Sequence, residues 1–344
     1  MFSLVIYSSR KESNIIAVNI SNGIFTDRLS ILYIVFDLDI SYNQPKFDSF
    51  TVWNSNGITI TDNNTVGTLP YAIFISRNNT IYIPGRNIDG IYIWMNDSIN
   101  PTKKINTNRQ IQFSIFVTSN GDIYTGSINS PFPINRWLSN ETNTSATIAY
   151  SDGDSLGIFI DINNTLYFSA TDKHKVLSKS LSSSSNILTI VAGTGVAGNA
   201  PNMLNRAFGL FVDDNFDLYV ADWGNNRVQL FRQGQQNAIT VAGSGSLNVT
   251  ITLNRPIHVV LDMDKYLFIV DQFNNRIVRS GPNGFCCIIG CTSSSGSALN
   301  ELNWPTSMAF DSFGNIYVVD EENHRIQKFL RLNNTLSKHV RILV

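Results

Sequence analysis

The feature that most constrains this chain is an internal repeat in which two apolar runs flank a polar turn. Residues 209–222 show it clearly: a short apolar run, a turn rich in Asp and Asn, and a second apolar run that ends in Asp. The same arrangement returns at residues 258–271 and 307–320. Three more divergent copies precede these, at residues 72–82, 114–124 and 157–167. In every copy an aromatic residue stands ten positions after the first residue: Tyr82, Tyr124, Tyr167, Tyr219, Phe268 and Tyr317.

The spacing of these aromatic residues predicts the fold class. Successive members are separated by 42, 43, 52, 49 and 49 positions, a period typical of β-propeller blades. The first apolar run of each copy is continuous, as expected of a strand that neighbouring blades cover on both faces. The chain shows no apolar period of about 3.6 residues, which argues against helical repeats. We therefore expect an all-β, six-bladed β-propeller with four-stranded blades.

Composition limits the partners. Charged residues make up 15% of the 344 residues, and the formal net charge is −1. Nucleic-acid binding requires a clear excess of Lys and Arg, so we expect no nucleic-acid partner. The apolar run at residues 29–40 is short and carries Asp37 and Asp39, so we expect no membrane-spanning segment. We expect the closed toroid to be a monomer.

The two ends of the repeat array predict how the ring closes. The last copy runs through its third strand at Phe329, and no outer strand follows it. Upstream of the first copy, residues 57–61 resemble a fourth strand that has no blade of its own. Pairing these residues with the third strand of the last blade would remove two open sheet edges. The expected organisation is an N-terminal extension at residues 1–44 and a propeller at residues 45–344.

Three copies share the pattern Asp-x-x-Asn-x-Arg, which we interpret as structural. A carboxylate, an amide and a guanidinium at fixed spacing could indicate chemistry. A group repeated in every well-formed blade, however, serves what every blade needs. We expect charge-assisted hydrogen bonds that hold the turn between the second and third strands. The residues are Asp222, Asn225 and Arg227; Asp271, Asn274 and Arg276; and Asp320, Asn323 and Arg325.

One position breaks the symmetry of the predicted inner strands. His258 aligns with residues that are all small, namely Ala72, Ser114, Gly157, Gly209 and Ser307. One interpretation places its imidazole in the axial channel, as a ligand or a base. The other is a hydrogen-bonded core or rim histidine. His258 is therefore a candidate binding residue.

The repeat also resembles a known family. Residues 305–326 carry Pro, a small apolar run, Asp, then Gly-Asn-Ile-Tyr-Val-x-Asp-x-x-Asn-x-Arg-Ile, which resembles the NHL repeat. Good copies cover residues 204–330, and degenerate ones extend back to about residue 45. Residues 84–86 and 125–127 depart from the pattern, because they replace the turn after the strand-ending Asp.

The resemblance implies a binding platform more readily than an enzyme. Amidating lyases of this repeat type hold zinc with three histidines from different blades. Here His174, His324 and His339 fall at turns or in the tail, and no inner strand carries the Glu with which lactonase-like propellers hold calcium. We expect no catalytic residues, metal or cofactor. A metal-dependent lyase or hydrolase with an axial site near His258 is one alternative. A recognition module related to those of RING-type ubiquitin ligases, without the RING, is another.

Aromatic residues supply the remaining candidate site. Trp223, Phe273 and Trp304 follow strand ends or precede strand starts, so we expect them on one face of the propeller. Exposed aromatic side chains are ready anchors for a partner. The expected partner is a protein, a peptide or a glycan.

The compartment stays open. We expect Cys286, Cys287 and Cys291 to be small buried residues on one strand, with a local disulfide as the alternative. From the short apolar run at residues 1–7 we expect no signal peptide in the given sequence. Sequons such as the one at residues 63–65 are a weak indication of secretion.

Overall fold

The structure is a computed structural model that describes residues 6–8, 15–19, 31–35, 40–87, 89–107, 111–139, 144–247, 251–292 and 294–332. The chain divides into two compact units, Met1–Asp39 and Ile40–Val344. In the first unit, β1 (Ile6–Ser8), β2 (Ile15–Asn19) and β3 (Ile31–Val35) form an antiparallel sheet in that order.

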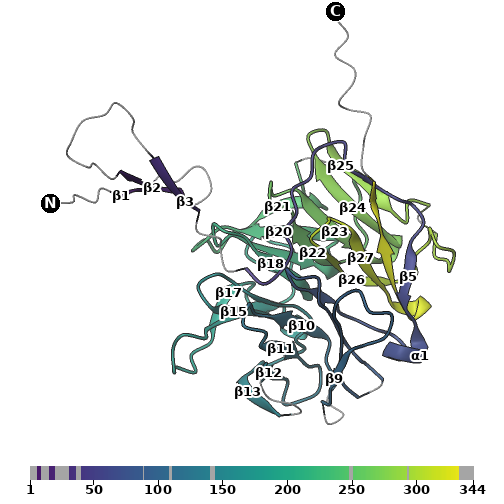
Figure 1. The fold of residues 1–344 in the computed structure, drawn as a ribbon. Coiled ribbons are helices and arrows are strands. Elements are labelled where there is room, and N and C mark those ends of the chain that lie inside the picture. Colours follow the sequence, from purple (N-terminus) through teal and green to yellow (C-terminus); the bar gives the residue numbers. More distant parts are fainter. Residues whose placement is uncertain are drawn as a thin grey trace, which may run out of the picture. The chain divides into compact units, whose positions relative to one another are not determined.

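The second unit is a six-bladed β-propeller, which confirms the predicted fold class (Figure 1). Each blade is a four-stranded antiparallel sheet within the described residues. The first three blades are β6 (Phe74–Ile75), β7 (Ile81–Pro84), β8 (Ile91–Trp94) and β9 (Lys103–Ile105); β10 (Ser114–Val117), β11 (Ile123–Gly126), β12 (Pro133–Trp137) and β13 (Ser145–Tyr150); and β14 (Ile158–Ile160), β15 (Thr165–Ala170), β16 (Lys175–Ser180) and β17 (Thr189–Ala192).

The last three blades have the same strand order. They are β18 (Ala207–Val212), β19 (Leu218–Asp222), β20 (Arg227–Phe231) and β21 (Ile239–Gly243); β22 (Pro256–Leu261), β23 (Leu267–Asp271), β24 (Arg276–Gly281) and β25 (Gly284–Ile289); and β26 (Pro305–Phe310), β27 (Ile316–Asp320), β28 (Arg325–Phe329) and β5 (Ile58–Thr61).

The ring closes as predicted. Strand β5 is the outer strand of the sixth blade and pairs antiparallel with β28, with Thr61 opposite Ile326 and Ile58 opposite Lys328. A second pairing adds to this closure, because β4 (Val52–Trp53) pairs with β29 (Arg331–Leu332). The sequence pattern gave no sign of β29.

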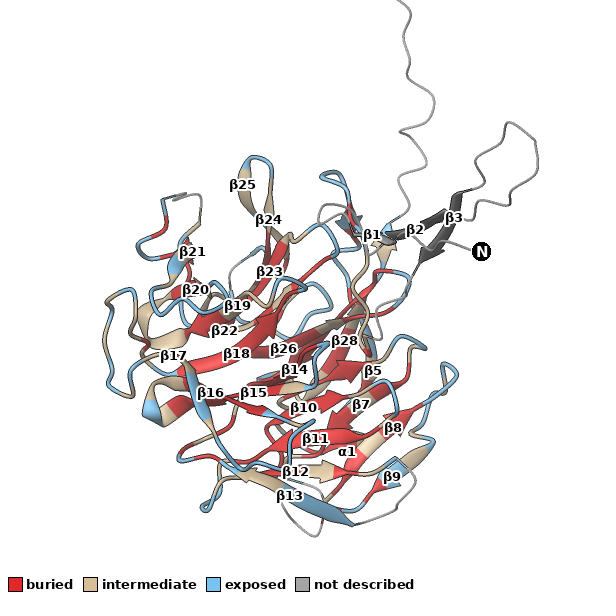
Figure 2. Cartoon of the chain, turned by 90° about the vertical axis from the view of Figure 1, so that its left-hand side faces the viewer, coloured by how far each residue is buried: buried red, intermediate tan, exposed pale blue. Residues whose placement is uncertain are grey.

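Burial falls from the inner strands to the outer ones (Figure 2). All six residues of β18 are buried, because neighbouring blades cover both of its faces. The outer strand β21, by contrast, begins with exposed and half-buried residues. The continuous apolar runs in the sequence therefore correspond to the inner strands around the axis.

The propeller unit begins five residues before the expected boundary at residue 45. Tyr42 forms an isolated antiparallel bridge with Ser76. Asn43 Nδ2 donates hydrogen bonds to the carbonyl oxygens of Ser76, at 2.8 Å, and of Phe310, at 3.1 Å. Phe47 is 1% exposed. Residues 42–47 therefore pack into the propeller rather than extending from it.

Helical structure is sparse in the described residues. It consists of α1 (Asn63–Val66) and four single 3-10 turns after the second strands of blades three to six: η1 (Thr171–Lys173), η2 (Trp223–Asn225), η3 (Gln272–Asn274) and η4 (Glu321–Asn323). Within the described residues, no helix is both long enough and apolar enough to cross a membrane.

The cysteines differ from the expectation of small buried residues. Cys287 and Cys291 form a disulfide, and Cys286 is exposed with a free thiol. Because side chains alternate along β25, Cys286 and Cys287 point to opposite faces of that strand. The apolar-residue interpretation was therefore wrong, and the alternative of a local disulfide is what the structure has.

Candidate functional site

The six aligned positions of the inner strands come together around one cavity. Ala72, Ser114, Gly157, Gly209, His258 and Ser307 all line it, at the end of the channel where the inner strands begin. Its volume is about 40 Å³, which is room for a few water molecules. The cavity therefore exists because five of the six residues carry almost no side chain.

His258 is the one large polar side chain in this ring. It is half-buried, and its Nδ1 atom is buried without a hydrogen-bond partner among the described residues. Burial lowers the pKa of the imidazole to about 4, so the ring is neutral at pH 7. A Cβ atom on Gly209 would lie 2.9 Å from His258 Cδ2. The same Cβ would lie 2.7 Å from Ile257 O and 2.8 Å from His258 Cα, so the glycine chiefly lets the backbones of blades four and five approach closely.

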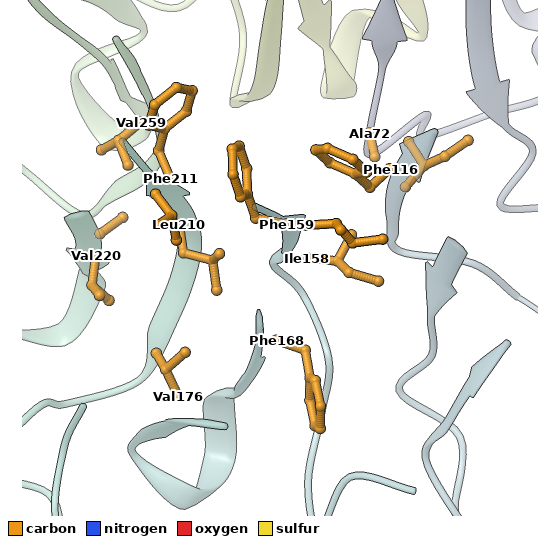
Figure 3. Close-up of a cluster of buried hydrophobic side chains, with 14 of the residues drawn as sticks. Ala72, Phe116, Ile158, Phe159, Phe168, Val176, Leu210, Phe211, Val220 and Val259 are labelled. Carbon is orange, nitrogen blue, oxygen red and sulfur yellow. The ribbon is translucent and has the colours of Figure 1, made fainter. Parts of the chain in front are cut away.

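Aromatic side chains close the channel beyond this cavity. Phe116, Phe159 and Phe211, from β10, β14 and β18, lie side by side (Figure 3), with ring centroids 5.1 Å and 4.9 Å apart. Tyr42 packs against all three at 5.4–6.2 Å. Burial raises the pKa of its phenol. A ligand in the channel would therefore enter from the face where the inner strands begin.

The same face carries what we call the aromatic–arginine cluster, formed by Arg206, Trp223, Arg255, Phe273 and Trp304. The rings of Phe273 and Trp304 lie 4.8 Å apart at 34°, and those of Trp223 and Phe273 lie 6.0 Å apart at 82°. The Arg255 guanidinium carbon is 4.1 Å from the Trp223 ring centroid and 4.5 Å from that of Phe273. That of Arg206 lies 5.3 Å from Trp223. Trp304 is 42% exposed.

Three members of the cluster occupy the same position of the repeat in successive blades. Arg206, Arg255 and Trp304 each stand three residues before the cavity-lining residue of their blade, with φ of 60°, 54° and 52°. A side chain of the preceding blade accepts a hydrogen bond from each of their backbone N–H groups. The acceptors are His174 Nδ1 at 3.0 Å, Asn226 Oδ1 at 2.8 Å and Asn275 Oδ1 at 3.0 Å. These bonds offset the strain of a left-handed backbone at a non-glycine residue.

An ion pair fixes another part of this face. Arg86 pairs with Glu321 between the first and sixth blades, and its guanidinium carbon lies 5.0 Å from the Phe113 ring and 5.9 Å from the Tyr71 ring. Tyr71 and Phe113 both line the cavity. Burial raises the pKa of the Glu321 carboxyl to about 7, and the charge of Arg86 opposes part of that shift. The cation is thus held against its carboxylate and two rings.

The repeated Asp-x-x-Asn-x-Arg residues have one geometry in all three blades. In blade four, Asp222 Oδ2 accepts from Asn225 Nδ2 at 2.8 Å and from Arg227 Nε at 2.7 Å, while Asp222 Oδ1 accepts from the Asn205 backbone N–H. Arg227 also donates to three backbone carbonyls of the loop before β18. Blades five and six repeat the core of this arrangement. Every donor in this group therefore binds either the Asp carboxylate or a backbone carbonyl. This arrangement holds the turn in place.

The other histidines lie outside the cavity. His174 and His324 each follow a 3-10 turn, and their Nδ1 atoms accept backbone hydrogen bonds from Arg206 and Leu69. His339 lies outside the described residues. Among the residues that the structure describes, no group of three or more His, Cys, Asp or Glu side chains is arranged to hold a metal ion.

Comparison with known proteins identifies the type of repeat. No curated protein matches the chain. Residues 302–329 match the model of the NHL repeat, and they contain β26, β27 and β28 of the sixth blade. The sixth blade matches the NHL repeat.

The solved structures that are similar to this propeller carry names that state different functions. One is a protein of unknown function from Bacteroides thetaiotaomicron, with 13% identity, a TM-score of 0.66, and coverage of 96% of this chain and 98% of that one. An auxiliary nutrient binding protein from the same organism has 12% identity, a TM-score of 0.60, and coverage of 93% and 84%. Virginiamycin B lyase from Staphylococcus aureus has 14% identity, a TM-score of 0.55, and coverage of 79% and 97%. At these identities the likeness is one of fold.

The structure brings together three of the four residues singled out in the sequence. Trp223, Phe273 and Trp304 are neighbours in the aromatic–arginine cluster, and His258 lines the cavity. Sequence reasoning missed the two arginines of the cluster. Their signal was available, because Arg206 and Arg255 occupy the same repeat position as Trp304.

Proposed function

We propose that this NHL propeller is a non-catalytic binding platform whose partner docks on the aromatic–arginine cluster. The observation that carries the proposal is the continuous row of ring contacts from Trp223 through Phe273 to Trp304. These residues come from three successive blades, and the row ends in an exposed indole. Large, rigid aromatic side chains bind at low conformational cost and dominate many interfaces. This row of rings is already in place without a partner.

The size of the axial cavity supports a partner that lies across its mouth. Sites that enclose organic ligands have volumes of roughly 300–1,000 Å³, whereas this cavity has about 40 Å³. A peptide or protein loop could cover the face and reach His258 with one small group. The auxiliary nutrient binding proteins among the similar structures are in keeping with a binding role for this architecture.

The test compares two exposed aromatic residues at opposite ends of β26. Trp304 directly precedes the strand, and Phe313, which is 69% exposed, lies in the turn after it. Peptides selected from a phage-displayed random library on the wild-type chain should lose affinity by about tenfold or more against the Trp304→Ala variant. Affinity for the Phe313→Ala variant should stay unchanged, and thermal melts should show both variants folded. Peptides that bind both variants equally would refute the proposed face.

A second candidate function is metal-dependent lyase or hydrolase chemistry at the axial cavity. The buried, unpartnered Nδ1 of His258 favours it, since such an atom costs about 1–3 kcal/mol unless a water, metal or ligand engages it. One similar structure is a lyase by name. Metal analysis of the purified native chain separates the two functions. The binding-platform proposal expects substoichiometric zinc and calcium, and one equivalent of either, lost in the His258→Ser variant, would support the enzyme instead.

A further inference from the structure

Two arginine side chains share one indole ring on the proposed binding face. The guanidinium carbons of Arg206 and Arg255 lie 5.3 Å and 4.1 Å from the Trp223 ring centroid, and Arg255 also contacts Phe273 at 4.5 Å. Stacking engages the flat faces of a guanidinium and leaves its N–H edge free for bonds in the plane. It also fixes the side chain, so that less conformational entropy is lost when a ligand binds.

The N–H edges of these two arginines are not used within the described part of the chain. Arg227, Arg276 and Arg325 each donate to a carboxylate and to backbone carbonyls. Arg206 and Arg255 differ from them. Among the described residues neither guanidinium has a carboxylate within 4.0 Å. Six other arginines of the propeller do form such pairs: Arg86, Arg136, Arg227, Arg276, Arg279 and Arg325.

The local charge favours an anion of limited size. Two cations on one ring repel each other, and an anion that bridges them removes that repulsion. The neighbourhood also contains acidic groups: Asp154, whose pKa is raised by burial and partly lowered again by Arg206, and the Arg86–Glu321 pair. A long polyanion would meet these carboxylates, whereas one or two carboxylates would not.

We propose that Arg206 and Arg255 bind the side-chain carboxylates of an acidic peptide segment, next to an apolar side chain that packs on Trp304. This inference rests on the proposed binding function and names the chemistry of the partner. A guanidinium edge matches a carboxylate in a bidentate arrangement. The exposed Trp304 lies one ring further along this row, beyond Phe273. The recognised feature is therefore Asp or Glu followed or preceded at short distance by an aromatic or large aliphatic residue.

A peptide is favoured over a nucleic acid by the small number of free cations. Nucleic-acid binding relies on many phosphate contacts, and the formal net charge of the chain is −1. The cluster offers two unpaired guanidinium groups, which is enough for one or two carboxylates. Single-stranded RNA is accordingly a competitor in the test.

The experiment uses the full chain and the same phage-displayed library, in which random dodecapeptides are fused through their C-termini. The selected peptides should be enriched in Asp and Glu beside aromatic or large aliphatic residues. Replacing the carboxylates of a selected peptide by Asn or Gln should weaken binding about tenfold or more. The Arg206→Gln and Arg255→Gln variants should each weaken binding of the parent peptide by a similar factor. They should have little effect on the neutral peptide.

Three results would overturn the carboxylate inference. The first is selection of neutral peptides that still require Trp304, which leaves the binding face intact. The second is full affinity of the neutral peptide for the wild-type chain. The third is a labelled RNA oligonucleotide that binds more tightly than any selected peptide and is lost in the Arg255→Gln variant. A library that yields no peptide dependent on Trp304 would instead overturn the proposed function itself. Because peptide substitutions leave the protein unchanged, the test holds even where an arginine variant unfolds.

Discussion

At the scale of single residues, the inner ring shows how one substitution creates a chemical feature in a symmetric fold. Five of the six blades place Ala, Ser or Gly at this position beside the axis. Blade five places His258 there instead. The imidazole lies beside Gly209 of the fourth blade, where the absence of a Cβ lets the backbones of the two blades approach closely. The ring is kept neutral because burial disfavours its charged form.

His258 should make the propeller sensitive to acid. Its pKa falls from the ordinary 6.5 to about 4 on folding, so between these values the unfolded chain binds a proton that the folded chain does not. Stability should therefore fall as the pH drops from 6.5 to 4, by up to about 3 kcal/mol. Above pH 7 the contribution is fully retained. Urea unfolding of the wild type and the His258→Ser variant at pH 7 and pH 4 measures this as a change in the stability difference.

Using the difference between the two proteins isolates the histidine. The pKa of Glu321 is raised to about 7 and that of Asp262 to about 6, in both cases chiefly by burial. These carboxyls hold protons in the folded state and stabilise it as the pH falls, the opposite of His258. Both are present in the variant and cancel. A stability difference that is the same at both pH values would show that the imidazole titrates normally.

A second single residue, Arg279, holds the N-terminal segment against the fifth blade. It is 3% exposed, and its Nη1 donates to the carbonyl oxygen of Asp48 at 2.9 Å. Its guanidinium carbon lies 4.7–5.9 Å from four ring centroids, those of Tyr266, Phe268, Phe47 and Trp53. Burial lowers its pKa. Two of these rings precede the first blade, so the cation ties the segment before that blade to the fifth blade.

At the scale of elements, the turn clamps and the closing strand do different work. The Asp-x-x-Asn-x-Arg clamp acts within a blade, where Asp222, Asp271 and Asp320 each take a backbone N–H, an amide and a guanidinium. Strand β5 acts between the chain ends, since it supplies the outer strand of the last blade. The residues between Ile40 and β5 add a buried segment that includes Phe47.

Truncation from the N-terminus should separate these contributions. Removal of residues 1–39 leaves the compact unit Ile40–Val344 whole, so the thermal midpoint should stay near that of the full chain. Removal of residues 1–62 deletes β5 and exposes the edge of β28, and should lead to aggregation or loss of a cooperative transition. Removal of residues 1–44 takes away Tyr42 and Asn43 and should lower stability by about 3 kcal/mol or more, as loss of a buried aromatic side chain does.

Differential scanning calorimetry of the three truncations measures their stability and cooperativity, and size-exclusion chromatography measures their aggregation. A chain without residues 1–44 that melts like the full chain would show that Tyr42 does not support the ring. A chain without residues 1–62 that remains soluble and cooperative would show that closure does not depend on β5.

At the scale of the whole propeller unit, the two ends of the axial channel differ. Tyr42 and three phenylalanines fill it beyond the cavity. The face where the inner strands begin carries the cavity mouth, the Arg86–Glu321 pair and the aromatic–arginine cluster. This asymmetry is the basis for the proposed binding face, and it arises from residues at corresponding positions of different blades.

The sequence alone determined the fold class, the blade order, the inner strands and the closing strand. These features are periodic, and each repeat carries the same local signals: an apolar run, an Asp-rich turn and a strand-ending Asp. Periodic local signals can be read without coordinates, since every copy tests the others. The sequence also singled out Trp223, Phe273 and Trp304 as candidate binding residues, because they lie beside the ends of predicted strands.

Only the tertiary structure decided which of those residues touch. Trp223 and Phe273 are separated by a full repeat, and their contact depends on the angle between neighbouring blades. The same angle decides the approach of Arg206 and Arg255 to one indole. Tyr42 was assigned to the extension because its segment lacks the repeat, yet it packs against rings from three blades. Contacts between residues far apart in the chain leave no periodic mark, because they arise from how whole sheets pack around the axis.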